Sequence, residues 1–159
     1  MKDSWEIFLA ALGDESETLN RVHTAALSLT QALVDGSPTM IRDAERSLES
    51  ARVAFTSASS RRRGIQIRGF GQLGLHAVCG YAPRRLSQAF FGRISELTTH
   101  SIGLKITSNN NKALIAAGME RLVNITGAMQ KAASDGAGTY KRRGFVPPPS
   151  NSVLVSSRA

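Results

Sequence analysis

Apolar residues recur every three or four positions through the first 35 residues, and this spacing constrains the fold more than any other feature. The face that they form is Trp5, Phe8, Leu12, Glu15, Leu19, Val22, Ala26, Leu29 and Leu33, with Glu15 as its one charged member. Alternating steps of three and four place these side chains along one side of an α-helix. Gly36 and Pro38 are typical of a helix end. The sequence therefore predicts one long helix over about residues 4–35.

A second helix is predicted to begin directly after the first. Ser37 is a favourable N-cap residue, and Pro38 suits the first helical position. The same spacing then continues at Ile41, Ala44, Leu48, Ala51, Phe55 and Ala58. We therefore expect two antiparallel helices joined by a tight turn.

The segment from about residue 59 to residue 81 is rich in arginine and glycine. It contains Arg61, Arg62 and Arg63, followed by glycines at positions 64, 69, 71, 74 and 80. Glycine destabilises a helix interior. This segment is therefore predicted to be a flexible connection between helices.

A third, longer helix is predicted to begin at Pro83 and to end at about Gly136. Its apolar face contains Leu86, Phe90, Ile94, Leu97, Leu104, Ile115, Leu122, Ile125, Met129 and Ala132. The same face turns polar at Ser101, Ser108 and Asn111. A polar layer that sets the register of a bundle and a local break in the helix both explain this change.

These helices predict an all-α fold: an elongated antiparallel helical bundle, or hairpin, of three long helices. The chain has 159 residues, the size of one domain. Residues 1–135 are predicted to form this domain, with the connection at about 59–81 inside it. Residues 136–159 are rich in Gly, Ser, Pro and Arg and have no periodic apolar face, so they are predicted to be a disordered C-terminal tail.

The composition favours a cytoplasmic protein. Cys79 is the only cysteine of the chain, so no intramolecular disulfide can form. The N-terminal residues include both acids and bases, and no stretch of about 18 uncharged apolar residues occurs. We expect neither a signal peptide nor membrane insertion.

The net charge of +8 is distributed unevenly. Residues 1–60 hold five basic and nine acidic residues, a net charge of −4, whereas residues 61–159 hold fifteen basic and three acidic residues, a net charge of +12. A basic half attracts polyanions or acidic protein surfaces. The basic clusters at residues 61–68, 84–85 and 141–143 do not follow one helix face, and few aromatic residues accompany them. A basic nucleic-acid-binding protein is therefore a less favoured alternative.

No residue pattern predicts catalysis. Gly69, Gly71 and Gly74 match the GxGxxG motif, but that motif holds a dinucleotide only between a strand and a helix, and helices are predicted on both sides. The histidines are scattered, and no His, Cys or carboxylate residues cluster at metal-ligand spacing. We predict no enzymatic activity, no cofactor and no metal.

The C-terminal third contains a further pattern. Residues 111–115 read NKALI, the helical face continues through Met119, Leu122, Ala128 and Ala132, and residues 138–144 read GTYKRRG. These features resemble the flagellar export chaperones of the FlgN type, a family of type III secretion chaperones. The resemblance extends over about 35 of the 159 residues.

The resemblance implies a cytoplasmic chaperone that binds the C-terminal helical segments of flagellar hook-associated proteins. Such a chaperone prevents their premature assembly and delivers them to the export gate and ATPase complex. Because an amphipathic client helix is held by anchors at helical spacing, the predicted client-binding residues are Asn111, Leu114, Ile115, Met119 and Leu122. Tyr140 matches the tyrosine that this family links to docking at the gate.

Exposed apolar residues that capture a client would also favour association between two copies of the chain. A self-associating coiled-coil protein with a structural or regulatory role is therefore the alternative interpretation. The sequence does not distinguish between these two kinds of binding.

Overall fold

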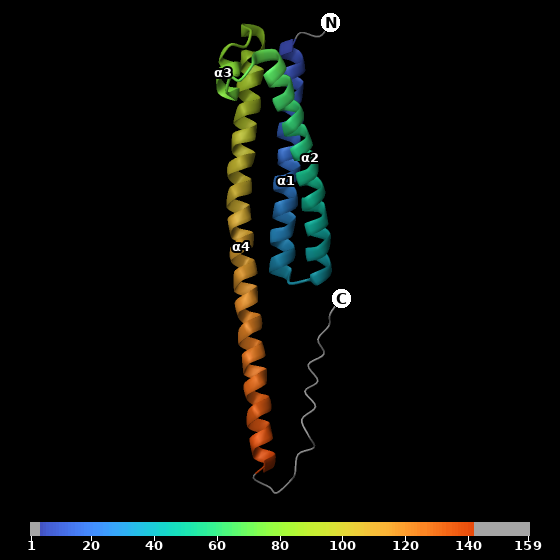
Figure 1. Ribbon diagram of the computed structural model, residues 1–159, viewed down its shortest axis with the longest axis vertical. Coiled ribbons are helices and arrows are strands. Elements are labelled where there is room, and N and C mark those ends of the chain that lie inside the picture. Colours follow the sequence, from blue (N-terminus) through green and yellow to red (C-terminus); the bar gives the residue numbers. More distant parts are fainter. Residues whose placement is uncertain (1–3, 142–159) are drawn as a thin grey trace. The chain divides into compact units, whose positions relative to one another are not determined.

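The computed structural model describes the backbone of residues 4–141 and the side chains of residues 4–134. Its helices are α1 (Ser4–Asp35), α2 (Pro38–Phe70), α3 (Leu75–Gly80) and α4 (Arg84–Lys141) (Figure 1). The described residues contain no strand, which confirms the all-α prediction. The prediction of three helices is wrong, because α3 forms within the segment predicted as a connection.

The chain divides into two compact units, residues 1–115 and residues 116–159. The first unit contains α1, α2, α3 and the first part of α4, whereas the described part of the second unit is the remainder of α4. A compact unit is defined by its contacts, which do not test whether it folds independently. The prediction of one domain over residues 1–135 therefore stays a prediction.

Helices α1 and α2 form the predicted antiparallel pair (Figure 1). In the turn between them, the Ser37 hydroxyl accepts a hydrogen bond from the Met40 N–H at 3.5 Å. Gly36 has a φ of 67°, a conformation that glycine adopts without strain. The predicted face of α1 is buried at Phe8, Leu12, Glu15, Leu19, Val22, Ala26 and Leu29. The predicted face of α2 is buried at Ala44 and Ala58 and half-buried at its other positions.

The main apolar cluster draws residues from all four helices. Its buried members are Phe8 and Leu12 of α1, Val78 and Cys79 of α3, and Phe90 and Ile94 of α4. Aromatic contacts add to this packing: the ring centroids lie 4.4 Å apart for Trp5 and Phe70, and 5.6 Å apart for Phe8 and Phe90. This cluster joins the ends of α2 and α3 to the start of α4.

Helix α2 continues to Phe70, through residues that the sequence assigned to the connection. Each glycine inside a helix costs about 1 kcal/mol relative to alanine, and Gly64 and Gly69 both lie within α2. Ile65 and Phe70 pack against the main cluster. Burial of such a side chain stabilises by up to about 1.5–3 kcal/mol, so tertiary packing outweighs the local preference.

Helix α3 forms for the same reason. Val78 and Cys79 are 0% and 1% exposed, so this short helix is held by burial and not by its own propensity. Burial also raises the pKa of the Cys79 thiol, and the positive charge of Arg62 opposes that rise. Cys79 is therefore a packing residue that stays a neutral thiol at neutral pH.

Helix α4 is unbroken from Arg84 to Lys141, including residues 109–111. A local break at this position is thereby excluded. Residues 136–141, which the sequence assigned to the tail, belong to α4, and this part of the tail prediction is wrong. The rest of the predicted tail, residues 142–159, lies outside the described residues.

Within residues 1–115, α4 runs alongside α1 in the same direction. Arg85 contacts Glu6 at 3.0 Å, Ser16 donates to Glu96 at 3.1 Å, and Thr30 donates to Asn111 at 2.7 Å, in the same order along both helices. Polar side chains therefore make much of the contact between α1 and α4.

Among the glycines of α4 with described side-chain surroundings, Gly103 is the one that lies against a side chain of α1. A Cβ atom at this position would lie 2.5 Å from the His23 ring, whereas a Cβ at Gly92 of the same helix would meet nothing within 4 Å. We expect Gly92→Ala to raise the free energy of unfolding by about 0.5–1 kcal/mol through helix propensity. Gly103→Ala should lower it, because the half-buried His23 ring must move; chemical denaturation of both variants measures the difference. Equal stabilisation by the two changes would contradict this packing.

Candidate binding surface

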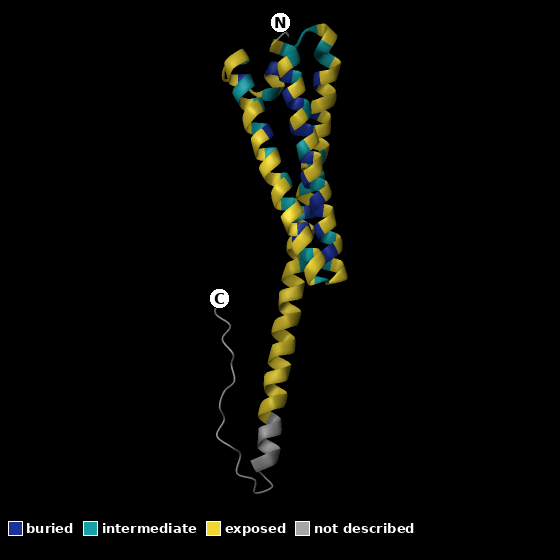
Figure 2. Ribbon diagram, turned by 90° about the vertical axis from the view of Figure 1, so that its right-hand side faces the viewer, coloured by how far each residue is buried: buried dark blue, intermediate teal, exposed yellow. Residues whose placement is uncertain are grey.

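The second half of α4 carries large apolar side chains in water. Every residue from 115 to 134 is exposed (Figure 2). The largest exposed fractions belong to Met119 (64%), Leu122 (65%), Val123 (70%), Ile125 (57%) and Met129 (68%). Exposed apolar residues that gather on one surface are typical of a binding site for another molecule.

These side chains continue a pattern that is buried earlier in the same helix. We define the α4 seam as the positions at alternating steps of four and three: Phe90, Ile94, Leu97, Ser101, Leu104, Ser108, Asn111, Ile115, Gly118, Leu122, Ile125, Met129 and Ala132. Phe90, Ile94 and Asn111 of the seam are buried, whereas Leu122 and Met129 are among the most exposed apolar residues of the described part of the chain. One helical face thus changes from internal contact to open surface.

The residues predicted to bind a client fall into two groups. Ile115, Met119 and Leu122 are exposed, and Leu114 is half-buried. Asn111 is only 6% exposed, and its amide accepts a hydrogen bond from Thr30 and donates one to the Ala26 carbonyl oxygen at 3.1 Å. Asn111 therefore lies in the α1–α4 contact, where a buried amide sets the register of the two helices.

Tyr140 belongs to the last turn of α4, and its side chain lies outside the described side chains. Its predicted role in gate docking stays a prediction.

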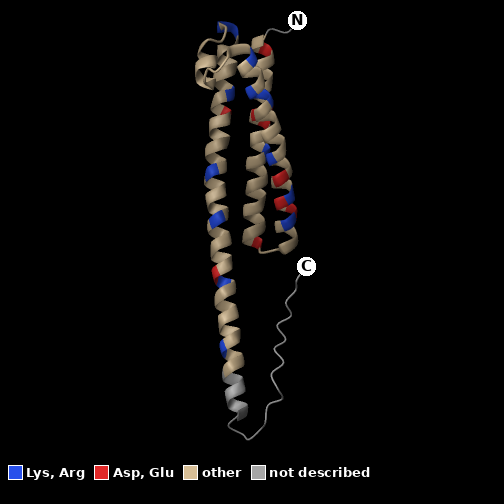
Figure 3. Cartoon of the chain, in the orientation of Figure 1, with Lys and Arg blue, Asp and Glu red and all other residues tan. Residues whose placement is uncertain are grey.

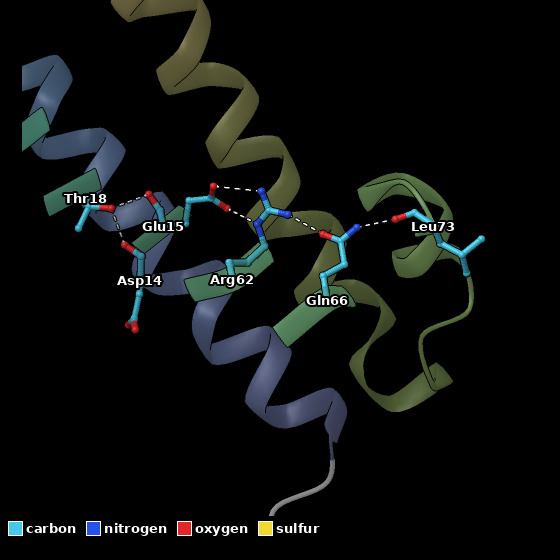
Figure 4. A network of polar contacts seen from close by, with 6 residues as sticks. All are labelled: Asp14, Glu15, Thr18, Arg62, Gln66 and Leu73. Atoms are coloured by element: carbon cyan, nitrogen blue, oxygen red, sulfur yellow. Dashed lines mark hydrogen bonds and ion pairs between the residues drawn. The ribbon is translucent and has the colours of Figure 1, made fainter. Parts of the chain in front are cut away.

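A polar network that the sequence analysis missed connects α1, α2 and the α2–α3 turn (Figure 4). The Arg62 guanidinium donates to both carboxylate oxygens of Glu15, at 2.7 and 3.2 Å, and also to Gln66. Gln66 in turn donates to the Leu73 carbonyl oxygen. The side chains of Glu15 and Arg62 are 6% and 15% exposed. Glu15 was the one charge on the apolar face of α1, and this was the available signal that a basic partner exists.

The neighbouring arginine is also engaged within the chain. Arg61 contacts Asp14 at 3.2 Å. Two of the three successive arginines are thus bound to carboxylates of α1, which leaves less positive charge at this end of α2 for phosphate groups. Their contacts disfavour the nucleic-acid alternative.

An open groove of about 710 Å³ lies between α1 and α4. Its charged lining includes Glu17, Arg93 and Glu96. Arg93 donates a hydrogen bond to Glu96 at 2.8 Å, which holds the pKa of the Glu96 carboxyl below its usual value, and the Ser16 hydroxyl acts in the same direction. Glu17 is likewise bonded to Arg21. Both carboxylates are thus bound to arginines of the same chain.

The glycine motif has no strand beside it. Gly69 lies in α2, Gly71 ends that helix, and Gly74 precedes α3. The arrangement of a dinucleotide cradle is therefore absent from the described residues. The described side chains also form no group of three or more His, Cys, Asp or Glu residues that could hold a metal ion. Among the described helices, none has the length and hydropathy to span a bilayer.

Comparisons with protein-family models, with curated proteins and with solved structures gave no match. The geometry of α4 is therefore the main basis for a functional conclusion.

Proposed function

We propose that this protein is a non-catalytic chaperone that holds an amphipathic helix of a client along the exposed part of α4. The observation that supports the proposal is the run of exposed residues from 115 to 134, which carries six large apolar side chains. A helix of this kind gains stability when a partner covers its apolar face.

The number of anchors matters for affinity. Full burial of one Leu, Ile or Met side chain stabilises by at most about 1.5–3 kcal/mol, and association costs about 4–15 kcal/mol in lost freedom. One or two anchors are therefore too few, and several exposed apolar residues must bind together. Exposed anchors lie at Ile115, Met119, Leu122, Ile125 and Met129, so the segment supplies enough of them.

The resemblance to the FlgN type assigns the client. On this proposal, the client is the C-terminal helical segment of a flagellar hook-associated protein, which the chaperone keeps unassembled in the cytoplasm and delivers to the export gate. Leu114, Ile115, Met119 and Leu122 take part in capture, and Tyr140 takes part in delivery.

Self-association is a second candidate. Ile115, Leu122 and Met129 are spaced by seven residues, the repeat of a coiled coil. Purification of the tagged full-length chain from its own cells separates the candidates. Hook-associated proteins in the eluate support the chaperone, the chain alone in an oligomer supports self-association, and absorbance of bound nucleic acid supports the basic alternative.

Changes to the seam test capture directly. We expect Leu122→Asp combined with Met129→Asp to weaken binding of a peptide with the client's C-terminal sequence by about 100-fold, because two anchors are lost and two carboxylates are desolvated. The matched control is Asn124→Asp combined with Gln130→Glu, which adds the same charge away from the two anchors. Fluorescence anisotropy measures both affinities. Equal binding by the two double variants would contradict the proposal, and circular dichroism checks that α4 stays helical.

A further inference from the structure

Helix α4 carries positive charge that no other part of the described structure neutralises. Between Leu97 and Ser134 the chain has one acidic residue, Glu120, and four basic residues: Lys105, Lys112, Arg121 and Lys131 (Figure 3). The side chains of these four bases make no salt bridge or hydrogen bond with another described residue.

The contrast with the rest of the protein is clear. Every salt bridge among the described residues joins partners that precede Leu97, such as Arg62 with Glu15 and Arg93 with Glu96. Five of the eight bases of α1 and α2 are thus matched with acids inside the chain: Arg21, Arg46, Arg52, Arg61 and Arg62. The bases of α4 beyond Leu97 are not matched in this way, although an acid one helical turn away would be the simplest partner for each of them.

The register of the seam places three of these bases beside the apolar face, and Arg121 is the one beside its exposed part, because α1 contacts the seam near Lys105 and Lys112. If Ile115, Leu122 and Met129 occupy position a of a heptad, then Gly118 and Ile125 occupy position d. Arg121 then occupies position g, and Lys105 and Lys112 occupy position e of the two preceding heptads. Positions e and g flank the apolar seam and form the ion pairs between helices that select a partner.

The remaining two charges lie elsewhere on the helix. Glu120 occupies position f and Lys131 position c, both turned away from a partner on the seam. The charged residues on the flanks of the seam beyond Leu97 are therefore all basic, with Arg121 beside the exposed part, and the one acid lies on the opposite side.

From this pattern we infer that the helix received by α4 is acidic, with Glu or Asp at the positions beside its own apolar face. The inference rests on the proposed function and specifies its client. A second copy of the chain fits poorly, because the exposed part of the seam would meet another Arg121 and no acid at the positions beside its apolar face. Like charges across an interface suppress the wrong partner.

Two designed peptides test this inference with the full-length protein. Each spans about three heptads and has Leu at every a and d position; one carries Glu and the other Lys at every e and g position. We expect the acidic peptide to bind at least about tenfold more tightly at low salt. The difference should shrink at 1 M salt, where charges are screened beyond about 3 Å.

A pair of charge reversals separates a local effect from the general attraction of a basic protein. Arg121→Glu should weaken binding of the acidic peptide by about fivefold, since a favourable ion pair becomes a repulsion. Lys131→Glu changes the net charge equally but lies at position c, so it should change the affinity by less than about twofold.

The outcomes distinguish the inference from the function on which it rests. Equal binding of both peptides, or equal effects of Arg121→Glu and Lys131→Glu, would overturn the inference and leave helix capture intact. Binding of neither peptide would overturn both. Binding of duplex DNA more tightly than the acidic peptide, or a dimer of the chain that excludes the peptide, would overturn the inference in favour of that other partner.

Discussion

Replacement of Glu15 by alanine is expected to lower the free energy of unfolding by about 3–5 kcal/mol. The change removes the carboxylate that accepts two hydrogen bonds from Arg62, whose side chain is only 15% exposed. An unpaired buried guanidinium costs far more than the pair contributes in net terms. Denaturant unfolding followed by circular dichroism measures the loss.

Two controls identify the cause of that loss. Glu17 forms an exposed pair with Arg21, and Glu17→Ala should cost less than about 1 kcal/mol. Removal of both buried charges, as Glu15→Leu with Arg62→Met, should recover most of the stability, because no unpaired charge remains. If Glu15→Ala were as mild as Glu17→Ala, the buried pair would not be formed in solution.

The second large effect is expected at the junction of α3 and α4. Phe90 is 0% exposed and contacts the rings of Phe8 and Trp5, whereas the adjacent Phe91 is 54% exposed. Phe90→Ala should destabilise by about 3–5 kcal/mol through lost burial and a cavity. Phe91→Ala removes the same side chain from the surface and should change stability by about 0.5 kcal/mol or less.

Thermal unfolding of this pair checks the main cluster independently of the polar network. The two variants have the same composition, so any difference between them reports position alone. Similar melting temperatures for Phe90→Ala and Phe91→Ala would mean that α4 does not pack on α1 and α3 as described.

The two stability predictions and the binding predictions concern different parts of the chain. Glu15 and Phe90 belong to the unit of residues 1–115, whereas Leu122, Met129 and the reversed charges belong to residues 116–159. A seam variant that unfolds the first unit would therefore contradict the division of roles. Stability and binding have to be measured on the same samples.

The local pattern of residues determined the long helices. The spacing from Trp5 to Leu33 identified α1 and its buried face, and Gly36, Ser37 and Pro38 located the turn into α2. These features are readable because each depends on residues a few positions apart along the chain. The seam of α4 was readable for the same reason, and the part of the candidate surface from Ile115 to Leu122 followed from it.

Only the tertiary structure decided which stretches of an apolar face are covered and where helix forms against the local preference. Local glycine content argued against helix at residues 59–81, yet contacts of Ile65, Phe70 and Val78 with α1 and α4 stabilise α2 and α3 there. The pairing of Glu15 with Arg62 joins residues 47 positions apart, a distance that periodicity cannot span. Asn111 and Leu122 occupy the same seam, but Asn111 is buried and Leu122 is exposed. The difference depends on whether α1 lies against that part of the face. Spacing specifies a helix and its apolar side, whereas burial depends on which other segment lies against it.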